Sequence, residues 1–177
     1  LGNEINLSFD FFENQFDGLI DTVVDGADSM YVNRNLSSAR TQGVEFELRG
    51  ITGALAGYAS YSYQDATDDT GAWLTNSPHH LAKAGFAFPL VRYLRCGLES
   101  QYESERLTVY GTETESFLLV NLNLTTAFHP FSTRTTASLL VRNVFDEAYG
   151  TPGGFEHVQH AIEQDGRTFI LGLETRF

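Results

Sequence analysis

The amino-acid sequence predicts an all-β fold: a transmembrane β-barrel segment of about eight antiparallel, up-and-down strands. Apolar and polar residues alternate with a period of two in stretches that recur about every twenty residues. Short and long connections follow one another along the chain, which is the pattern of bacterial outer-membrane barrels. The last stretch, Arg167–Phe177, has the roughly nine to eleven residues that a tilted strand needs to cross a bilayer.

Four predicted strands occupy the first half of the chain, and each has one apolar face. They are Glu4–Gln15, Gly43–Arg49, Leu55–Gln64 and His80–Pro89. Their apolar positions are Ile5, Leu7, Phe9 and Phe11; Val44, Phe46 and Leu48; Leu55, Ala59, Tyr61 and Tyr63; and Ala82, Ala84, Phe86 and Phe88. The second face of Gly43–Arg49 carries two acids and an arginine, which must meet water or a partner because an unpaired charge in hydrocarbon costs several kcal/mol.

Four more strands are predicted in the second half, and their second faces are polar. They are Leu94–Thr108, Leu118–Phe128, Arg134–Phe145 and Arg167–Phe177. Glu99, Glu103 and Glu105 share one face of the fifth strand, which suits a wet interior better than a dry core. We expect such interior acids to pair with arginine and lysine residues or to line water; the candidate partners are Arg49, Lys83, Arg142 and Arg176.

The connections between the predicted strands sort into two lengths. The short ones are Gly50–Gly53, Leu90–Tyr93 and His129–Thr133. The longer ones are Asp17–Asn35, Asp65–Pro78, Tyr110–Ser116 and Gly150–Gly166. In outer-membrane barrels the short turns are periplasmic and the long loops extracellular, so we expect the C-terminal Phe177 at the periplasmic rim.

Composition agrees with strands, and not helices, as the membrane-crossing elements. The 177 residues are 42% hydrophobic and 13% aromatic, and the mean hydropathy is −0.19. The longest apolar run, Ala84–Val91, contains Gly85 and Pro89 and is far shorter than the roughly 20 residues of a spanning helix. The chain opens at Leu1 without a signal peptide, and since a barrel needs export we expect an N-terminal part of a longer protein to precede it.

Charge and cysteine content exclude several function classes. The formal net charge is −12, with 11 Lys and Arg residues scattered among 23 acids, which argues against nucleic-acid binding. Cys96 is the single cysteine, so neither an internal disulfide nor a cysteine-based metal site is expected. No glycine-rich phosphate loop or nucleophile elbow occurs, and we predict that the protein is not an enzyme.

Four stretches in this order resemble the C-terminal barrel segment of TonB-dependent outer-membrane receptors. They are Ser38-Ala39-Arg40-Thr41-Gln42-Gly43-Val44-Glu45-Phe46-Glu47-Leu48, Asn76-Ser77-Pro78-His79-His80-Leu81, Asn143-Val144-Phe145-Asp146-Glu147-Ala148-Tyr149, and Gly166-Arg167-Thr168-Phe169 leading to Phe177. The terminal strand also resembles the signal read by the barrel-assembly machinery, through Phe169, Leu171, Leu173 and Phe177. Thr175 stands where the family often has a larger apolar or aromatic residue.

The resemblance implies a Gram-negative outer-membrane receptor with a barrel of about 22 strands and an N-terminal plug. Such receptors import siderophore-bound iron, haem, cobalamin or sugars, and an iron–siderophore complex is the leading expectation. Residues 1–177 then supply the last eight strands, while the plug, the earlier strands and the region that engages TonB have no match in the chain. Expected partners are outer-membrane lipid, the barrel-assembly machinery, TonB and a small molecule such as a metal chelate.

Six residues in the long connections are candidates for ligand binding. Rings and imidazoles in extracellular loops can stack on a ligand, and these are Tyr31, Trp73, Tyr110, Phe155, His157 and His160. The alternative is that the aromatics belong to a belt at the membrane interface and that the histidines are incidental. An acidic loop with Asp65, Asp68 and Asp69 lacks the ligand spacing of a calcium loop, so no metal site and no cofactor are predicted.

Two other readings remain open beside the receptor. One is a self-contained eight-stranded barrel with a structural or adhesive role, in which Ile5–Phe11 pairs with Phe169–Phe177 to close the sheet. The other is a soluble β-rich binding module. The first reading predicts a closed barrel whose interior is filled by side chains, whereas a piece of a larger barrel leaves both sheet edges open.

Overall fold

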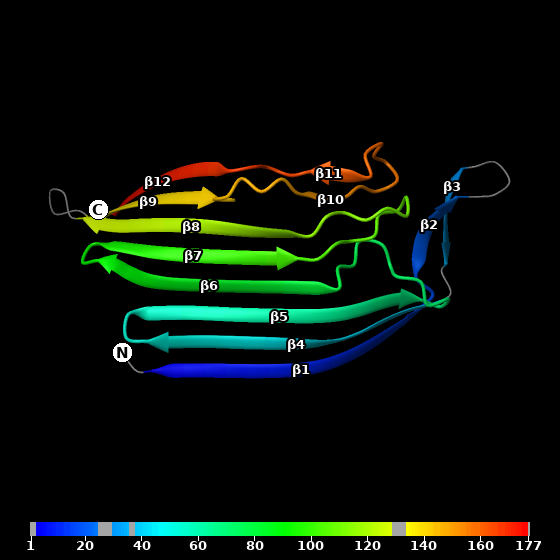
Figure 1. Ribbon diagram of the computed structural model, residues 1–177, viewed down its shortest axis with the longest axis horizontal. Helices are drawn as coiled ribbons and strands as arrows, with labels where there is room; N and C mark the ends of the chain where they lie inside the picture. The colour runs from blue at the N-terminus through cyan, green and yellow to red at the C-terminus, as the bar shows by residue number, and fades with distance from the viewer. Residues whose placement is uncertain (1–2, 25–29, 36–37, 129–133, 177) are drawn as a thin grey trace.

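The computed structural model describes residues 3–24, 30–35, 38–128 and 134–176, and all regular elements in these ranges are strands. Eight strands form one antiparallel sheet in the order β1-β4-β5-β6-β7-β8-β9-β12 (Figure 1). Their bounds are Glu4–Asp17, Ser38–Thr52, Leu55–Asp68, His80–Val91, Leu94–Glu103, Phe117–Phe128, Arg134–Arg142 and Thr168–Arg176. Within the described ranges no helix has the length and apolar character needed to span a membrane.

The sheet has one rim of tight turns and one rim of long connections. A two-residue turn at Gly53, with φ of +58°, joins β4 to β5, and another joins β6 to β7. The opposite rim carries two small hairpins, β2 (Ile20–Val24) with β3 (Tyr31–Asn35) and β10 (Gly150–Pro152) with β11 (Ala161–Glu163). Strand β1 begins and strand β12 ends at the rim with the tight turns (Figure 1). The predicted sorting of connections by length is therefore confirmed, and the predicted turn at His129–Thr133 lies outside the described residues.

Cross-strand register gives the sheet two chemically different faces. Leu48, Ala59, Ala84, Ser100 and Val120 lie in one row across β4, β5, β6, β7 and β8. We call the face that contains this row the apolar face. Between the row of Val44 and the tight turns, and as far as Leu173 on β12, no position on this face carries Asp, Glu, Lys or Arg. The reverse, polar face carries Glu45, Glu47, Arg49, Lys83, Glu99, Asn121, Asn123, Arg142, Glu174 and Arg176.

Neither face of the sheet is covered by another layer. Large apolar side chains are exposed along its whole width, from Phe11 at 77% in β1 to Leu171 at 82% in β12. A water-soluble domain hides such a face against a second layer, so the exposed band requires an apolar surrounding or a partner. On the polar face Arg49 pairs with Glu47 and Arg176 with Glu174, each two residues away on its own strand.

The ends of several strands differ from the sequence prediction. The predicted strand Leu94–Thr108 is wrong beyond Glu103, because the Ser104 backbone N–H donates to His80 O and the following residues fold into a small loop closed by a Leu107–Glu113 bridge. The predicted strand Arg134–Phe145 ends at Arg142, because Asn143 adopts a left-handed conformation with φ of +50°. Period-2 alternation continues past both ends, so alternation alone cannot mark them.

The long connections contain more structure than predicted. The strand Gly43–Arg49 extends to Ser38–Thr52, and the strand after it reaches Asp68, so the start of the predicted loop Asp65–Pro78 is strand. The connections Asp17–Asn35 and Gly150–Gly166 contain the hairpins β2–β3 and β10–β11. Short strands of three to five residues carry too few alternations to stand out from a polar loop in sequence.

The eight-stranded sheet is open. β1 and β12 stand at its two ends, and among the described residues no ladder joins them. The pairing of Ile5–Phe11 with Phe169 and its neighbours, which a self-contained small barrel requires, is therefore absent from this part of the chain. The arrangement is that of a wall segment with two unpaired edges.

Candidate functional site: the loop rim and the two faces of the wall

The apolar band ends sharply on the side of the long connections. In β1 it runs from Ile5 to Phe11, which at about 3.4 Å per residue is roughly 20 Å along the strand. Beyond it the same face becomes polar: the Arg40 guanidinium lies 3.1 Å from the Glu13 carboxylate, and Gln42 Nε2 donates to Asp65 Oδ2 at 3.4 Å. Strands β1, β4 and β5 thus continue past the band into a polar environment.

An aromatic shelf marks this boundary; we define it as Tyr61, Tyr63, His80 and Tyr102. All four lie on the apolar face at its loop end. Tyr61 Oη is 2.8 Å from His80 Nδ1, and the Tyr63 ring is 5.2 Å from the His80 ring. Rings with one polar end suit the depth at which hydrocarbon gives way to headgroups.

Trp73, one of the six predicted ligand residues, lies apart from the other five. It forms a bridge with Thr67, its ring stacks on His79 at 4.5 Å, and its Nε1–H donates to Ser77 O at 2.7 Å. Alternation along β5 puts Thr67 on the same face as the aromatic shelf. This placement favours the interface-belt reading for Trp73, and its role in ligand binding stays a prediction.

The other five predicted residues form a loop cluster, defined by Tyr31, Tyr110, Phe155, His157 and His160. The Tyr110 and His160 rings stack at 4.4 Å with an interplanar angle of 15°. Tyr110 Oη donates to His157 O at 2.6 Å, and the rings of Tyr31 and Phe155 are 5.0 Å apart. Three connections far apart in sequence therefore meet at one rim. Part-exposed ring faces beside hydroxyl and imidazole groups can stack on and hydrogen-bond a planar, polar ligand.

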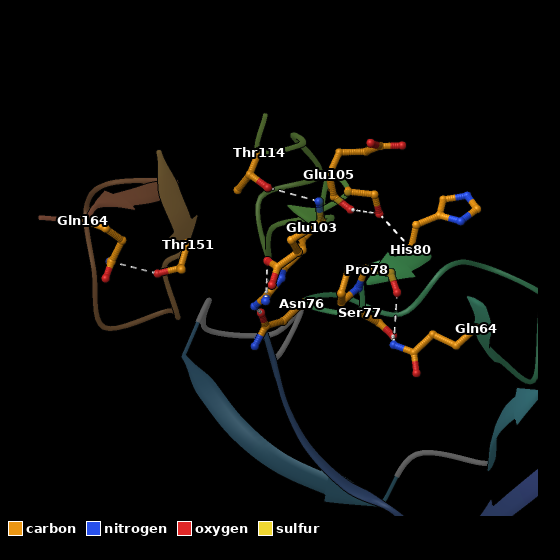
Figure 2. Close-up of polar contacts among 12 residues, drawn as sticks. Gln64, Asn76, Ser77, Pro78, His80, Glu103, Glu105, Thr114, Thr151 and Gln164 are labelled. Carbon is orange, nitrogen blue, oxygen red and sulfur yellow. Dashed lines mark hydrogen bonds and ion pairs between the residues drawn. The ribbon is translucent and has the colours of Figure 1, made fainter. Parts of the chain in front are cut away.

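A buried ion pair lies beneath the loops, and sequence reasoning did not find it. Glu103, whose side chain is 6% exposed, pairs with Arg106, whose side chain is 20% exposed. Arg106 Nη1 also donates to Asn76 Oδ1 at 2.9 Å, and the Asn76 backbone N–H donates to Leu107 O (Figure 2). Arg106 Nε is buried and has no hydrogen-bond partner among the described residues. Through its bond to Asn76, Arg106 joins the β7–β8 connection to the β5–β6 connection.

The neighbouring contacts use side chains to satisfy the loop backbone. Gln64 Nε2 donates to Ser77 Oγ and to Pro78 O at 3.2 and 3.0 Å. The His80 backbone N–H donates to Ser104 Oγ at 3.1 Å, and the Arg106 backbone N–H donates to Thr114 Oγ1 at 3.0 Å (Figure 2). The stretch Asn76-Ser77-Pro78 stood out in the sequence, but the contacts that explain it come from β5 and the β7–β8 connection.

Side-chain hydrogen bonds to the backbone also hold the start of the β9–β12 connection. The Asn143 side chain accepts from the Glu147 N–H and donates to Glu147 O, both at 2.9 Å. Asp146 Oδ1 accepts from the Arg167 N–H at 2.7 Å. These contacts give a physical reason for the stretches Asn143–Tyr149 and Gly166–Phe169, because each side chain closes a turn that backbone pairing leaves open.

The acidic loop is closed by one of its own carboxylates. Asp68 Oδ1 accepts from Thr70 Oγ1 at 2.7 Å and from the backbone N–H groups of Thr70 and Ala72 at 2.9 Å. The Thr70 hydroxyl, with those N–H groups, lowers the pKa of Asp68 below its ordinary 3.8. In the described ranges no three His, Cys, Asp or Glu side chains gather closely enough to hold a metal ion.

An open antiparallel sheet with one charge-free apolar face, one polar face and long loops on a single rim defines a piece of an outer-membrane barrel wall. A family model described as TonB dependent receptor-like, beta-barrel, matches residues 1–144. The chain belongs to this family, which confirms the resemblance seen in the motifs and implies the Gram-negative outer membrane. The comparison with curated proteins finds no match.

Solved receptors share the fold. The pyoverdine receptor FpvA of Pseudomonas aeruginosa, bound to pyoverdine, has a TM-score of 0.77 and 20% identity over 98% of this chain and 27% of its own. The ferric-catecholate import receptor Fiu of E. coli K12 gives 0.73 and 20% over 96% and 25%. BauA, the ferric preacinetobactin receptor of Acinetobacter baumannii, gives 0.75 and 14% over 96% and 27%. The chain thus spans about a quarter of the length of these receptors.

The predicted barrel-assembly signal lies on the terminal strand. Phe169, Leu171 and Leu173 project from the apolar face of β12, which is an edge of the sheet, and all three are exposed. Phe177 lies outside the described residues. The role of these four residues in assembly stays a prediction.

Proposed function

We propose that residues 1–177 form the C-terminal part of the barrel of a TonB-dependent receptor that imports a ferric siderophore across the outer membrane. The observation that carries the proposal is the two-faced open wall of a chain in this receptor family, because such a wall needs further strands to enclose a lumen. FpvA, Fiu and BauA are named for three different iron chelates, so iron–siderophore complexes are the class that their names share.

Each surface of the wall has a part in this proposal. The apolar face contacts lipid, the polar face lines the lumen, and the loop cluster at the extracellular rim contributes to capturing the ligand. The C-terminus is then periplasmic, and the end of β12 at the rim of tight turns supports this (Figure 1). The barrel-assembly machinery reads the terminal strand, and TonB acts through a plug region that precedes Leu1 in the complete receptor.

The alternatives have less support. A self-contained small barrel requires closure that the described sheet lacks, and a soluble module leaves the exposed apolar face unexplained. We propose no catalytic activity, because the family is one of receptors and the loop cluster brings together rings without an activated nucleophile.

Growth under iron limitation tests the function. The gene is disrupted and the cells are supplied in turn with ferric pyoverdine, a ferric catecholate, a ferric hydroxamate or haem as the iron source, and a cobalamin-requiring strain is supplied with cobalamin in a separate growth test with sufficient iron. The expected result is a growth defect restricted to one of the ferric siderophores and restored by the intact gene. A defect confined to haem or cobalamin, or uptake that persists after TonB is removed, contradicts the proposal.

A further inference from the structure

The long connections of this protein carry far more acids than bases. The stretches 18–37, 69–79, 104–116 and 143–167 together contain twelve aspartates and glutamates but only three arginines, which are Arg34, Arg106 and Arg167. All four stretches lie at the rim where the loop cluster forms. A ligand that approaches this rim therefore meets mainly negative charge.

The three arginines are already engaged. Arg106 pairs with the buried Glu103 carboxylate, and Arg167 Nη2 lies 3.8 Å from Asp146 Oδ2. Arg34 also interacts with another group. An anionic ligand would have to displace one of these contacts before it met a positive charge in the connections.

Two acids lie directly beside the loop cluster. Glu156 precedes His157 in the chain, its Oε1 atom lies 3.4 Å from His157 Nε2, and its side chain is 75% exposed. Glu113 follows Thr112, whose Oγ1 atom lies 3.1 Å from His160 Nδ1, and Glu113 is exposed as well. A ligand on the ring faces of the cluster therefore has a solvent-exposed carboxylate on each of two connections near it.

The polar face of the wall just below the connections is acidic too. Asp10, Glu45, Ser62, Leu81 and Glu103 form one row across β1, β4, β5, β6 and β7. In the described part of these five strands, neither this row nor any polar-face position between it and the connections carries Lys or Arg. A ligand that moves from the cluster toward the lumen thus passes further carboxylates.

The net charge of a ferric chelate depends on the groups that bind the iron. Three hydroxamates, each with a single negative charge, balance Fe³⁺ and give a neutral complex, or a singly positive one where the chelator has a pendant ammonium group. Three catecholates, each doubly negative, leave a triply negative complex. Carboxylates within a Debye length, about 8 Å at physiological salt, attract the cation and repel the anion. Aromatic ring faces pack on catechol rings and on methylene chains alike, so charge is the discriminating property.

We propose that the loop cluster receives a ferric chelate of zero or positive net charge, of the trihydroxamate class, and that the acidic connections disfavour tricatecholate and citrate chelates. This inference rests on the proposed import function and specifies its substrate. The exposed ring of Tyr110 packs against the methylene chains of the chelator. The carboxylates of Glu113 and Glu156 lie beside it and attract an ammonium group where the chelator has one.

Uptake of radioiron by cells that express the complete receptor, in a host without other receptors for ferric siderophores, tests the charge class. The probes are ferrioxamine B, which is singly positive, neutral ferrichrome, triply negative ferric enterobactin, anionic ferric citrate and ferric pyoverdine. Receptor-dependent uptake is expected for ferrioxamine B, ferrichrome or both, and for neither enterobactin nor citrate. Receptor-dependent uptake of ferric enterobactin or ferric citrate overturns the proposal but leaves the import function standing. Uptake of none of these chelates contradicts the import function itself.

Binding to the purified complete receptor assigns the selectivity to carboxylates of this chain. Glu113→Gln combined with Glu156→Gln removes two surface charges at nearly constant side-chain size. Affinity for ferrioxamine B should fall about tenfold at low salt, and this difference should shrink as salt is added, whereas affinity for ferrichrome should stay within about threefold. Glu174→Gln, the same change at the rim of tight turns, should alter neither affinity.

Two results of the binding experiment would overturn the proposal. The first is a tighter complex of the imported chelate in the double variant, or an affinity of the unmodified receptor that rises with salt, because either means that the carboxylates repel the ligand. The second is a cationic imported chelate whose affinity is the same in the double variant, in Glu174→Gln and in the unmodified receptor.

Discussion

The wall of this protein exposes large apolar side chains, whereas the loop rim buries polar ones. In the wall, large apolar residues such as Phe11, Leu171 and Leu173 are more than two-thirds exposed. At the rim, polar residues are deeply buried: Ser104 and Thr108 are 1% exposed, and Glu103 and Asn143 are 4% exposed. The wall exposes apolar side chains, as a surface in contact with lipid does. The rim is as tightly buried as the interior of a soluble protein, but the buried groups are polar and hydrogen-bonded.

This difference indicates that the two regions are stabilised by different forces, so substitutions in them should change the stability of the protein in different ways. A wall residue contributes by being apolar where lipid surrounds it, so its identity matters less than its polarity and depth. A rim residue contributes through a specific partner, so its removal leaves another buried group unsatisfied. Substitutions chosen in pairs, one in each region, separate the two.

The largest effect is expected from the ion pair beneath the loops. Arg106→Ala leaves the nearly buried Glu103 carboxylate without its cation and removes the bond to Asn76, which should cost about 3 kcal/mol. Glu103→Gln combined with Arg106→Met removes both charges and should cost distinctly less. Urea-induced unfolding of the receptor in detergent measures both, and hydrogen exchange of residues 74–78 and 104–116 locates the change. Equal losses in the two variants would mean that the pair acts through packing and not through charge.

The second effect distinguishes the two faces of the wall. Leu98→Arg puts a charge on the apolar face near mid-band and should destabilise the folded barrel by roughly 2–4 kcal/mol. Gln101→Arg, on the polar face of the same strand β7 and opposite Lys83, should cost at most about 1 kcal/mol, the scale of a cross-strand charge pair. Urea midpoints in phospholipid vesicles provide the comparison. If both arginines cost the same, the assignment of the apolar face to lipid is wrong.

The third effect concerns ligand capture by the loop cluster. Tyr110→Ala removes the ring stacked on His160 and the bond to His157 O, and should weaken binding of the imported ferric siderophore by about tenfold. Tyr110→Phe keeps the stacking and should weaken binding by about threefold. Equilibrium binding to the purified receptor measures both. Trp73→Ala tests the sixth predicted ligand residue, which lies apart from the cluster: a comparable loss of affinity would support its role in ligand binding, and unchanged affinity would assign it to the interface belt.

The same contrast explains how much the sequence could predict. The faces of the wall follow from period-2 alternation, because successive side chains of a strand point to opposite sides and the residues of one side are nearly all apolar. The ends of β7 at Glu103 and of β9 at Arg142 could not be predicted. The first depends on a hydrogen bond to His80 O, which is distant in sequence, and the second on the left-handed backbone conformation of Asn143. The sequence puts Tyr110 and His160 in two long connections, and the contact between their rings is seen only in the structure. The contact of Asn76 with Arg106 joins two different connections, and neither sequence has a pattern that indicates it.

The smallest expected effect is the response of the Asp68 turn to acid. The pKa of Asp68 is lowered in the folded protein, so the turn gains stability above the ordinary pKa of 3.8 and loses it as the pH falls through the lowered value. Asp68→Asn should therefore loosen residues 70–72 already at neutral pH, whereas Asp69→Asn should not. Hydrogen exchange of this peptide, corrected for the intrinsic pH dependence of exchange, measures the opening. Because the carboxylate lies at the surface and bonds only within its own turn, the change should stay within the turn and leave the neighbouring wall strands protected. Acid-insensitive exchange at residues 70–72 in the unmodified receptor would show that the turn is held by its backbone and by Gly71 instead.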